Sequence, residues 1–323
     1  MTTTETLNIK ADETSEPAVE RDSFAPASQP QHATSSCVVA TFNIRYAVGR
    51  FLISGGLLRK AGLARKRPRA RVIERHIMAA AEAFTAGRLM PRADVIALQE
   101  ADRGTRRAGC VHVARALARA LEMHYAHAAM KIPPGEAPKA RQWYLDFEER
   151  IGVDDPGDTG VALLSRLPLA SAQRVELPWT ECAWRPRLAL AASVSFAGRQ
   201  LYIFNTHIDP HANVAEQLAQ HEAVLAECAA RQNDPVVVLG DFNTLFPKSR
   251  AAMRRLLKAH GFTTPMPTGT TTWRAGLVRL HADWLFVRNL RVLRWGVARP
   301  LHVSDHWPVW AEIELAEANN GAA

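Results

Sequence analysis

Short apolar runs that end in polar residues constrain the fold of this chain more than any other feature. The runs are rich in β-branched and aromatic residues, as buried strands are, and several of them end in Asn, Glu, His or Asp. We predict strands at 37–44, 94–99, 160–165, 188–196, 200–205, 235–239, 282–287 and 307–313. The chain is therefore expected to build its core from β-sheets.

Helical stretches fall between several of these strands. Apolar residues recur with a period of about 3.6 positions at 71–84, 111–123, 214–229 and 251–260. The runs 188–196 and 200–205 follow each other after a short connection, which favours antiparallel pairing and argues against a purely parallel sheet. We predict a layered α/β sandwich.

Length and composition fit one folded domain with two tails. The chain has 323 residues, of which 47% are hydrophobic, enough for one large packed core. Residues 1–36 are rich in Thr, Ser, Glu, Pro and Ala and hold few aliphatic residues, so their burial cannot offset the entropy of ordering the chain. We predict a disordered N-terminal tail over 1–36, a domain over 37–316 and a short C-terminal tail over 317–323.

The cysteines and the N-terminal residues favour a cytoplasmic protein. Cys37, Cys110, Cys182 and Cys228 lie far apart, without the paired spacing of a zinc site or a dense disulfide framework. The N-terminus lacks the basic start and apolar core of a signal peptide, and no segment approaches the ~20 apolar residues of a membrane span. We expect a cytoplasmic location and no transmembrane segment.

The formal net charge of +8 favours an anionic partner, although a generally basic proteome would explain it equally. The segment 46–75 places apolar residues before a run of Arg and Lys. That pattern is typical of contact with an anionic membrane surface and also of a clamp on a nucleic-acid backbone. An inserted surface loop whose leucines pack on the domain is the alternative.

Polar side chains at the ends of the predicted strands form the candidate site. They are Asn43, Gln99, Glu100, Thr206, His207, Asp241, Asn243, Asp283, Asp305 and His306. Strand ends gather at one rim, so these residues are expected to converge. Glu100 with Asn43 offers the oxygens that Mg²⁺ prefers. Asp241 would orient or deprotonate a water, and Asn243 would hold that water or a phosphate; an ordinary turn at 240–243 is the alternative.

Seven motifs occur in an order that resembles the endonuclease/exonuclease/phosphatase superfamily. They are Thr-Phe-Asn-Ile-Arg at 41–45, Leu-Gln-Glu at 98–100, Gly-Val-Ala-Leu-Leu-Ser-Arg at 160–166, Asn-Thr-His at 205–207, Gly-Asp-Phe-Asn at 240–243, His-Ala-Asp-Trp-Leu-Phe-Val at 281–287 and Ser-Asp-His at 304–306. The resemblance covers about 37–316. It implies two packed, mixed, largely antiparallel β-sheets flanked by helices, a four-layer α/β sandwich.

The resemblance also implies roles for individual residues. It assigns Asn43 and Glu100 to a metal site and adds Asp305 as a further ligand. It pairs His306 with Asp283, whose carboxylate would fix the tautomer and favour an imidazolium that faces phosphate.

His207 is the residue that sorts the chain within the superfamily. It resembles the histidine-containing branches of deoxyribonucleases, sphingomyelinases and inositol 5-phosphatases, where it would donate to a phosphate oxygen. Asp158 is a candidate to orient it. Substrate contacts are predicted for Arg103, Arg107 and Asn205, with a solvated basic loop as the alternative for the two arginines.

These observations predict a divalent-metal-dependent phosphoester hydrolase of the phosphodiesterase type. It would work by in-line attack of water on phosphorus, with Mg²⁺ as the ion and Mn²⁺ as the alternative. The substrate would be a phosphate ester, either nucleic acid or a phospholipid-type head group. The alternative class is a non-catalytic anion- or nucleic-acid-binding protein on the same fold.

Overall fold

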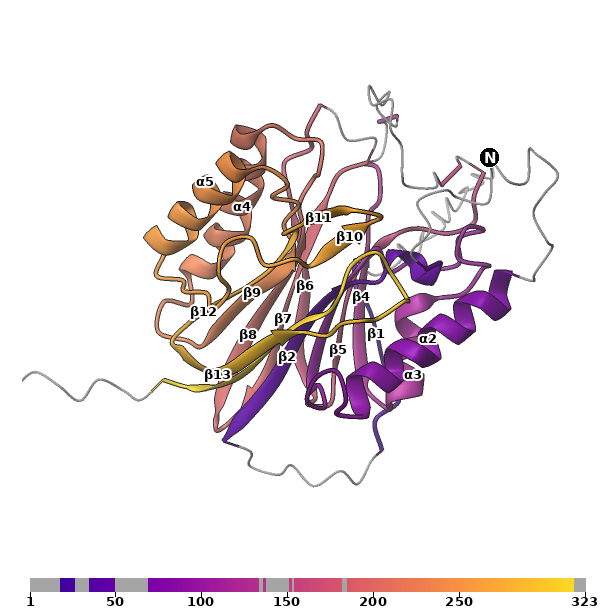
Figure 1. Ribbon diagram of the computed structural model, residues 1–323, viewed down its shortest axis with the longest axis horizontal. Coiled ribbons are helices and arrows are strands. Elements are labelled where there is room, and N and C mark those ends of the chain that lie inside the picture. The colour runs from indigo at the N-terminus through magenta and orange to yellow at the C-terminus, as the bar shows by residue number, and fades with distance from the viewer. Residues whose placement is uncertain are drawn as a thin grey trace, which may run out of the picture.

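The computed structural model describes residues 18–26, 35–49, 69–133, 136–137, 151–152, 154–181 and 185–316. In this part of the chain, two large β-sheets pack face to face beside a small β-hairpin (Figure 1). Most of the basic segment predicted at 46–75 lies outside the described residues, so its contact with membrane or nucleic acid stays a prediction. None of the helices in the described ranges is long and apolar enough to cross a membrane.

The larger sheet has seven strands in the order β1-β4-β5-β3-β2-β14-β13. Only β2 and β3 are parallel; the other neighbours pair antiparallel. Its strands are β1 (Glu20–Ser23), β2 (Ser36–Asn43), β3 (Val95–Gln99), β4 (His124–Ala129), β5 (Gly160–Ser165), β13 (Leu290–Val297) and β14 (Val309–Leu315).

The smaller sheet has five strands in the order β12-β9-β8-β7-β6, of which only β8 and β9 are parallel. Its strands are β6 (Leu169–Glu176), β7 (Leu188–Phe196), β8 (Arg199–His207), β9 (Val236–Asp241) and β12 (Asp283–Arg288). The hairpin consists of β10 (Trp273–Ala275) and β11 (Val278–Leu280).

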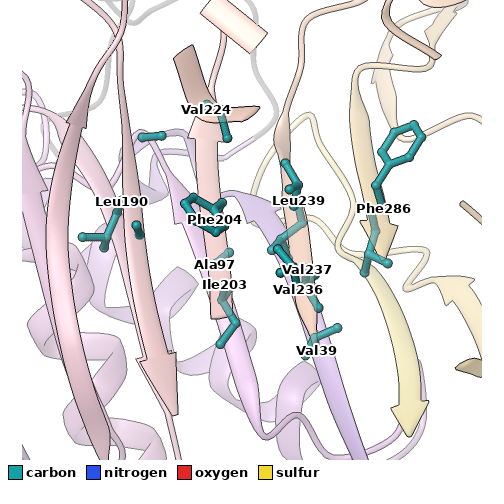
Figure 2. Packing of buried hydrophobic residues seen from close by; sticks show 14 of the residues in the cluster. Val39, Ala97, Leu190, Ile203, Phe204, Val224, Val236, Val237, Leu239 and Phe286 are labelled. Carbon is teal, nitrogen blue, oxygen red and sulfur yellow. The ribbon is translucent and has the colours of Figure 1, made fainter. Parts of the chain in front are cut away.

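Helices cover the outer face of each sheet. They are α2 (Arg69–Thr85) and α3 (Val113–Leu121) on the larger sheet, and α4 (Val214–Ala229) and α5 (Pro247–Ala259) on the smaller one (Figure 1). Alternation along β2 shows the layering, because Val39 packs between the sheets whereas Val38 and Ala40 pack with α2 and α3. Figure 2 shows Val39 near the valines of β9. The predicted four-layer α/β sandwich is confirmed.

The disorder predicted for the N-terminal tail is wrong for its residues 20–23, which form β1. This strand pairs antiparallel with β4, with Glu20 opposite His127. The Glu20 carboxylate accepts hydrogen bonds from the Tyr125 hydroxyl and lies 3.2 Å from His112 Nε2. These partners come from distant parts of the chain, so the polar composition of the segment does not reveal them.

One rim of the sandwich collects the ends of strands from both sheets. Strands β2 and β3 run parallel and end there, as do β8 and β9 of the other sheet. Strand β12 starts at the same rim because it runs antiparallel to β9. The segment 304–306 lies just before β14, whose first residue pairs with Thr41 near the end of β2.

Candidate active site

Strand register brings three of the predicted catalytic residues into one row. Asp241, at the end of β9, has His207 as its partner on β8 and Asp283 as its partner on β12. Side chains at paired positions of neighbouring strands point to the same face of a sheet. All three are buried, with exposed fractions of 1% or less. The row faces the larger sheet, since Asp241 contacts Asn43 at the end of β2.

Gly240 explains why the motif at 240–243 needs glycine. Its φ is +146°, a backbone conformation that other residues rarely adopt. A Cβ at this position would lie 1.9 Å from the carbonyl oxygen of Thr206. The close approach of β9 to β8 therefore depends on glycine, and it sets Asp241 beside His207.

His306 forms the closest ionisable pair of the site with Asp283. Its Nδ1 lies 2.8 Å from Asp283 Oδ2, and its Nε2 lies 3.8 Å from Asp241 Oδ2. Burial alone would lower the pKa of His306, but Asp283 and Asp241 outweigh it and raise the pKa to about 10. The ring is therefore an imidazolium near neutral pH, with one N–H on Asp283 and the other toward Asp241.

Asp241 occupies the centre of the arrangement. Its Oδ2 accepts a hydrogen bond from Asn43 Nδ2 at 3.0 Å, and its Oδ1 accepts one from the backbone N–H of Asn243 at 3.1 Å. Burial raises the pKa of Asp241, Asp283 raises it further, and His306 opposes both. A carboxyl group with a raised pKa is suited to exchanging a proton near neutral pH.

Asn243 lies in a turn and also at the candidate site, so the two interpretations of its motif are compatible. It adopts the left-handed conformation, with φ +48°, which asparagine tolerates well. Its Nδ2 donates to the carbonyl of Ile208 at 2.9 Å, and its own carbonyl accepts from Gln217. The turn thus fixes Asn243 two residues beyond Asp241, at the rim.

His207 has an arginine neighbour that the sequence analysis missed. Arg187 Nη1 lies 3.4 Å from His207 Nδ1 and 3.5 Å from its Nε2, and Arg187 is 7% exposed. Burial lowers the pKa of His207 well below its usual value, and Arg187 and His306 lower it further. The ring is therefore neutral. Asp158 does not orient it, because Asp158 pairs with Arg103 and Arg185.

The predicted metal ligands lie on the larger-sheet side of the site. Asn43 Nδ2 is 3.0 Å from Glu100 Oε1, so one amide joins Glu100 to Asp241. Asp305 Oδ2 accepts from Trp273 Nε1 at 3.0 Å and lies 3.5 Å from Arg45 Nη1. The structure thus brings Asn43 and Glu100 together and anchors Asp305 through its own partners.

The charge of the site fits a divalent cation. Among the residues that the structure describes, four carboxylates and three cationic groups meet at the site, and buried carboxylates favour a nearby cation. The hard oxygen donors are those that Mg²⁺ and Mn²⁺ prefer. The carboxylates are Glu100, Asp241, Asp283 and Asp305, and the cations are Arg45, Arg187 and the His306 imidazolium.

Two of the three residues predicted to contact substrate, Asn205 and Arg107, have buried side chains that hydrogen-bond within the protein instead. Asn205 is fully buried, donates to the carbonyls of Leu98 and Ala162 and accepts from Gln99 Nε2 at 2.6 Å. It therefore ties β8 of one sheet to β3 and β5 of the other.

The predicted substrate contact of Arg107 is also wrong. Arg107 is 2% exposed, donates to both oxygens of Asp102 and lies 4.0 Å over the Tyr46 ring.

Arg103 is partly exposed and lies 3.0 Å from Asp158 and 3.5 Å from Glu20. Its predicted contact with substrate would have to compete with these two carboxylates.

Comparisons with known proteins identify the family. A family model described as the Endonuclease/Exonuclease/phosphatase family matches residues 40–306. A search of curated proteins finds no match. A solved endonuclease/exonuclease/phosphatase from Beutenbergia cavernae DSM 12333 is 18% identical, covers 90% of this chain and 74% of its own, and superposes with a TM-score of 0.60.

Two further solved structures share the fold. Humanized D. rerio TDP2 is 18% identical with a TM-score of 0.56, over 87% of this chain and 100% of its own. ANGEL2, a 2',3'-cyclic phosphatase in complex with adenosine-2',3'-vanadate, is 16% identical with a TM-score of 0.55, over 87% of this chain and 96% of its own.

Proposed function

We propose, because the chain belongs to the Endonuclease/Exonuclease/phosphatase family, that it is a divalent-metal-dependent phosphodiesterase acting by in-line attack of water on phosphorus. Members of this family are phosphoesterases, which supports a hydrolase of phosphoesters. The observation that carries the finer proposal is the contact of the His306 imidazolium with both Asp283 and Asp241. It unites a fixed proton donor and a carboxylate of raised pKa in one buried place.

Asp241 is the proposed base. Its carboxylate would orient the attacking water and accept a proton from it, a role for which a raised pKa is favourable. Asn243 follows at the rim and would hold the same water or the phosphate. The hydrogen bonds from Asn43 and from the backbone of Asn243 keep the Asp241 carboxylate in place.

The cationic and N–H groups opposite Asp241 would stabilise the phosphoryl group. The Nε2–H of His306 faces the space beside Asp241, and Asp283 holds the ring in orientation. Arg187 and neutral His207 lie together next to it and would donate to phosphate oxygens as negative charge grows on them. Such preorganised donors commonly account for much of the rate enhancement.

Glu100 and Asn43 would hold the metal ion, with Asp305 as a further ligand. When bound, the ion would neutralise charge on a phosphate oxygen and polarise the bond to phosphorus. The carboxylate oxygens gathered in the site support this role, because Mg²⁺ and Mn²⁺ prefer hard oxygen ligands. Asp305, anchored by Trp273 and Arg45, would add its charge to the metal side of the site.

A small-substrate assay tests the proposal. Wild-type protein should hydrolyse bis-p-nitrophenyl phosphate in Mg²⁺ or Mn²⁺ and lose this activity in EDTA, and Asp241→Asn should lower kcat by about 10²–10⁴-fold. Asp234→Asn, which changes a half-buried carboxylate that pairs with Arg199 just before the start of β9, should retain wild-type rates. Full hydrolysis by Asp241→Asn would refute the mechanism. Tight anion binding by wild type without any turnover would favour the non-catalytic alternative.

A further inference from the structure

Helix α5 carries five basic residues and no acidic one. They are Lys248, Arg250, Arg254, Arg255 and Lys258. In the described part of the chain, no carboxylate lies within ion-pair distance of any of these five. On β13, by contrast, the exposed arginines Arg291 and Arg294 pair with Glu314 and Glu312.

The spacing of these cations adds a mutual repulsion of roughly 0.2–0.5 kcal/mol per neighbouring pair. Arg250, Arg254 and Lys258 follow each other at intervals of four residues and so lie in one row along the helix. Like charges at this spacing destabilise a helix. Arg250 and Arg254 also donate to backbone carbonyls, so a bound anion would chiefly compensate the exposed Arg255 and Lys258.

A groove of about 520 Å³ is lined by Arg254 and Lys258 of this row. Its other lining residues include Arg255, the hydroxyl-bearing Thr263, Thr264 and Thr268, and the apolar Phe286. Guanidinium, ammonium and hydroxyl groups are the side chains that contact phosphate oxygens in nucleic-acid complexes. The groove therefore offers the side-chain groups that bind the phosphates of a nucleic-acid backbone.

The groove begins next to the active site. Helix α5 starts at Pro247, four residues after Asn243, and Arg250 Nη1 donates to the carbonyls of Thr244 and Leu245. Its 13 residues extend about 20 Å from that end. Phe246, at the N-cap of α5, is 69% exposed and directly precedes Pro247, which lines the groove.

We propose that the groove along α5 binds the backbone of a single-stranded nucleic acid and that Phe246 stacks on one of its bases. A row of cations beside an exposed aromatic ring is how proteins hold single strands, because only an unpaired base offers its face for stacking. A phosphatidylserine head group offers a single phosphate, whereas three cationic side chains line the groove. The proposal rests on the proposed function and names its substrate class.

The test measures binding of a fluorescein-labelled oligothymidylate of about a dozen nucleotides by anisotropy at several salt concentrations in EDTA. The double variant Arg255→Gln/Lys258→Gln should weaken binding and lower the slope of log K against log salt by about 1.4, since each lost cation removes about 0.7 for a single strand. Phe246→Ala should weaken binding about tenfold or more without changing the slope.

The control variant Arg291→Gln/Arg294→Gln removes the same charge from exposed positions on β13 and should retain the wild-type slope. Equal slopes of log K against log salt for the two double variants would overturn the proposal. So would a wild-type protein that does not bind the oligonucleotide. If the Arg255→Gln/Lys258→Gln variant binds the oligonucleotide like wild type but loses binding to phosphatidylserine/phosphatidylcholine vesicles, the groove binds lipid and the proposal is overturned. Because EDTA stops any metal-dependent turnover, failure here and failure of the hydrolysis assay are distinguishable.

Discussion

His306 Nδ1 lies 2.8 Å from Asp283 Oδ2, although 23 positions separate the two residues in the chain. Both are buried, so the pair is shielded from water and its electrostatic interaction is strong. Asp283 is the carboxylate that contributes most to holding the pKa of His306 at about 10. The Asp283 carboxylate thus sets both the orientation and the positive charge of the His306 imidazole.

Replacing Asp283 should move the pH dependence of hydrolysis. Without the carboxylate in Asp283→Asn, the pKa of His306 falls, because burial lowers it and less negative charge opposes that effect. If activity requires the imidazolium, the alkaline loss of kcat/KM begins at lower pH than in wild type. The measurement is a pH–rate profile with bis-p-nitrophenyl phosphate. An alkaline limb that coincides in the two proteins would refute the role of the imidazolium.

Gly240→Ala should destabilise the fold and abolish activity together. The new Cβ would meet the Thr206 carbonyl oxygen at 1.9 Å, and backbone in a sheet cannot move away easily. Overpacking of this kind costs about 1–3 kcal/mol, and the positive φ adds strain. The measurement is the free energy of unfolding in urea.

Gly198→Ala is the matched control for Gly240→Ala. Gly198 also has a positive φ, +78°, but a Cβ there would meet nothing within 4 Å. Its replacement should cost only the conformational strain, about 1–2 kcal/mol, and leave hydrolysis unchanged. Equal losses at the two positions would show that the contact with Thr206 is unimportant.

Asn205→Leu tests whether Asn205 supports the fold or contacts substrate. The variant removes a hydrogen-bond donor from the carbonyls of Leu98 and Ala162 and one of three acceptors of the Gln99 amide. A buried polar group left unsatisfied costs about 1–3 kcal/mol. We expect a lower urea midpoint with an unchanged KM for protein that is still folded. A raised KM at wild-type stability would restore the substrate role. Gln200→Leu, at an exposed position of the same strand, should change stability by less than about 0.5 kcal/mol.

The elements that could be predicted from sequence are those whose own residues specify them. Helix α4 was predicted with its observed bounds, because its apolar face is periodic and a capping box of Asn213 and Glu216 closes its start. Strands β1, β4, β6, β10, β11 and β13 were missed. Of these, β1, β6 and β13 lie at the edges of the large sheets, so their polar residues face solvent and the pattern of a buried strand is absent.

The same distinction applies to the candidate site. His306, Asp283 and Asp241 belong to motifs at strand ends, and the structure brings them together as predicted. Asn205 and Arg107 were misassigned because their partners, Gln99 and Asp102, are visible only in three dimensions. Arg187 belongs to no motif. It precedes β7, and only the antiparallel pairing of β7 with β8 brings it to His207.

His221→Leu should reduce the acid sensitivity of the fold. His221 is buried on α4 against Phe242, and burial lowers its pKa to about 3. The folded pKa lies below that of the unfolded chain, about 6.5, so the unfolded state binds more protons between these values and stability is lost as pH falls from 6.5 toward 3. At about pH 5 the loss amounts to about 2 kcal/mol.

The measurement for His221→Leu is the free energy of urea unfolding near pH 7 and near pH 5. The difference between the two pH values should be about 2 kcal/mol smaller in the variant than in wild type, because leucine binds no proton. His260→Leu, which removes an exposed imidazole after α5, should keep the wild-type difference. If His221→Leu loses as much stability as wild type on acidification, other buried groups must account for the acid sensitivity of the protein.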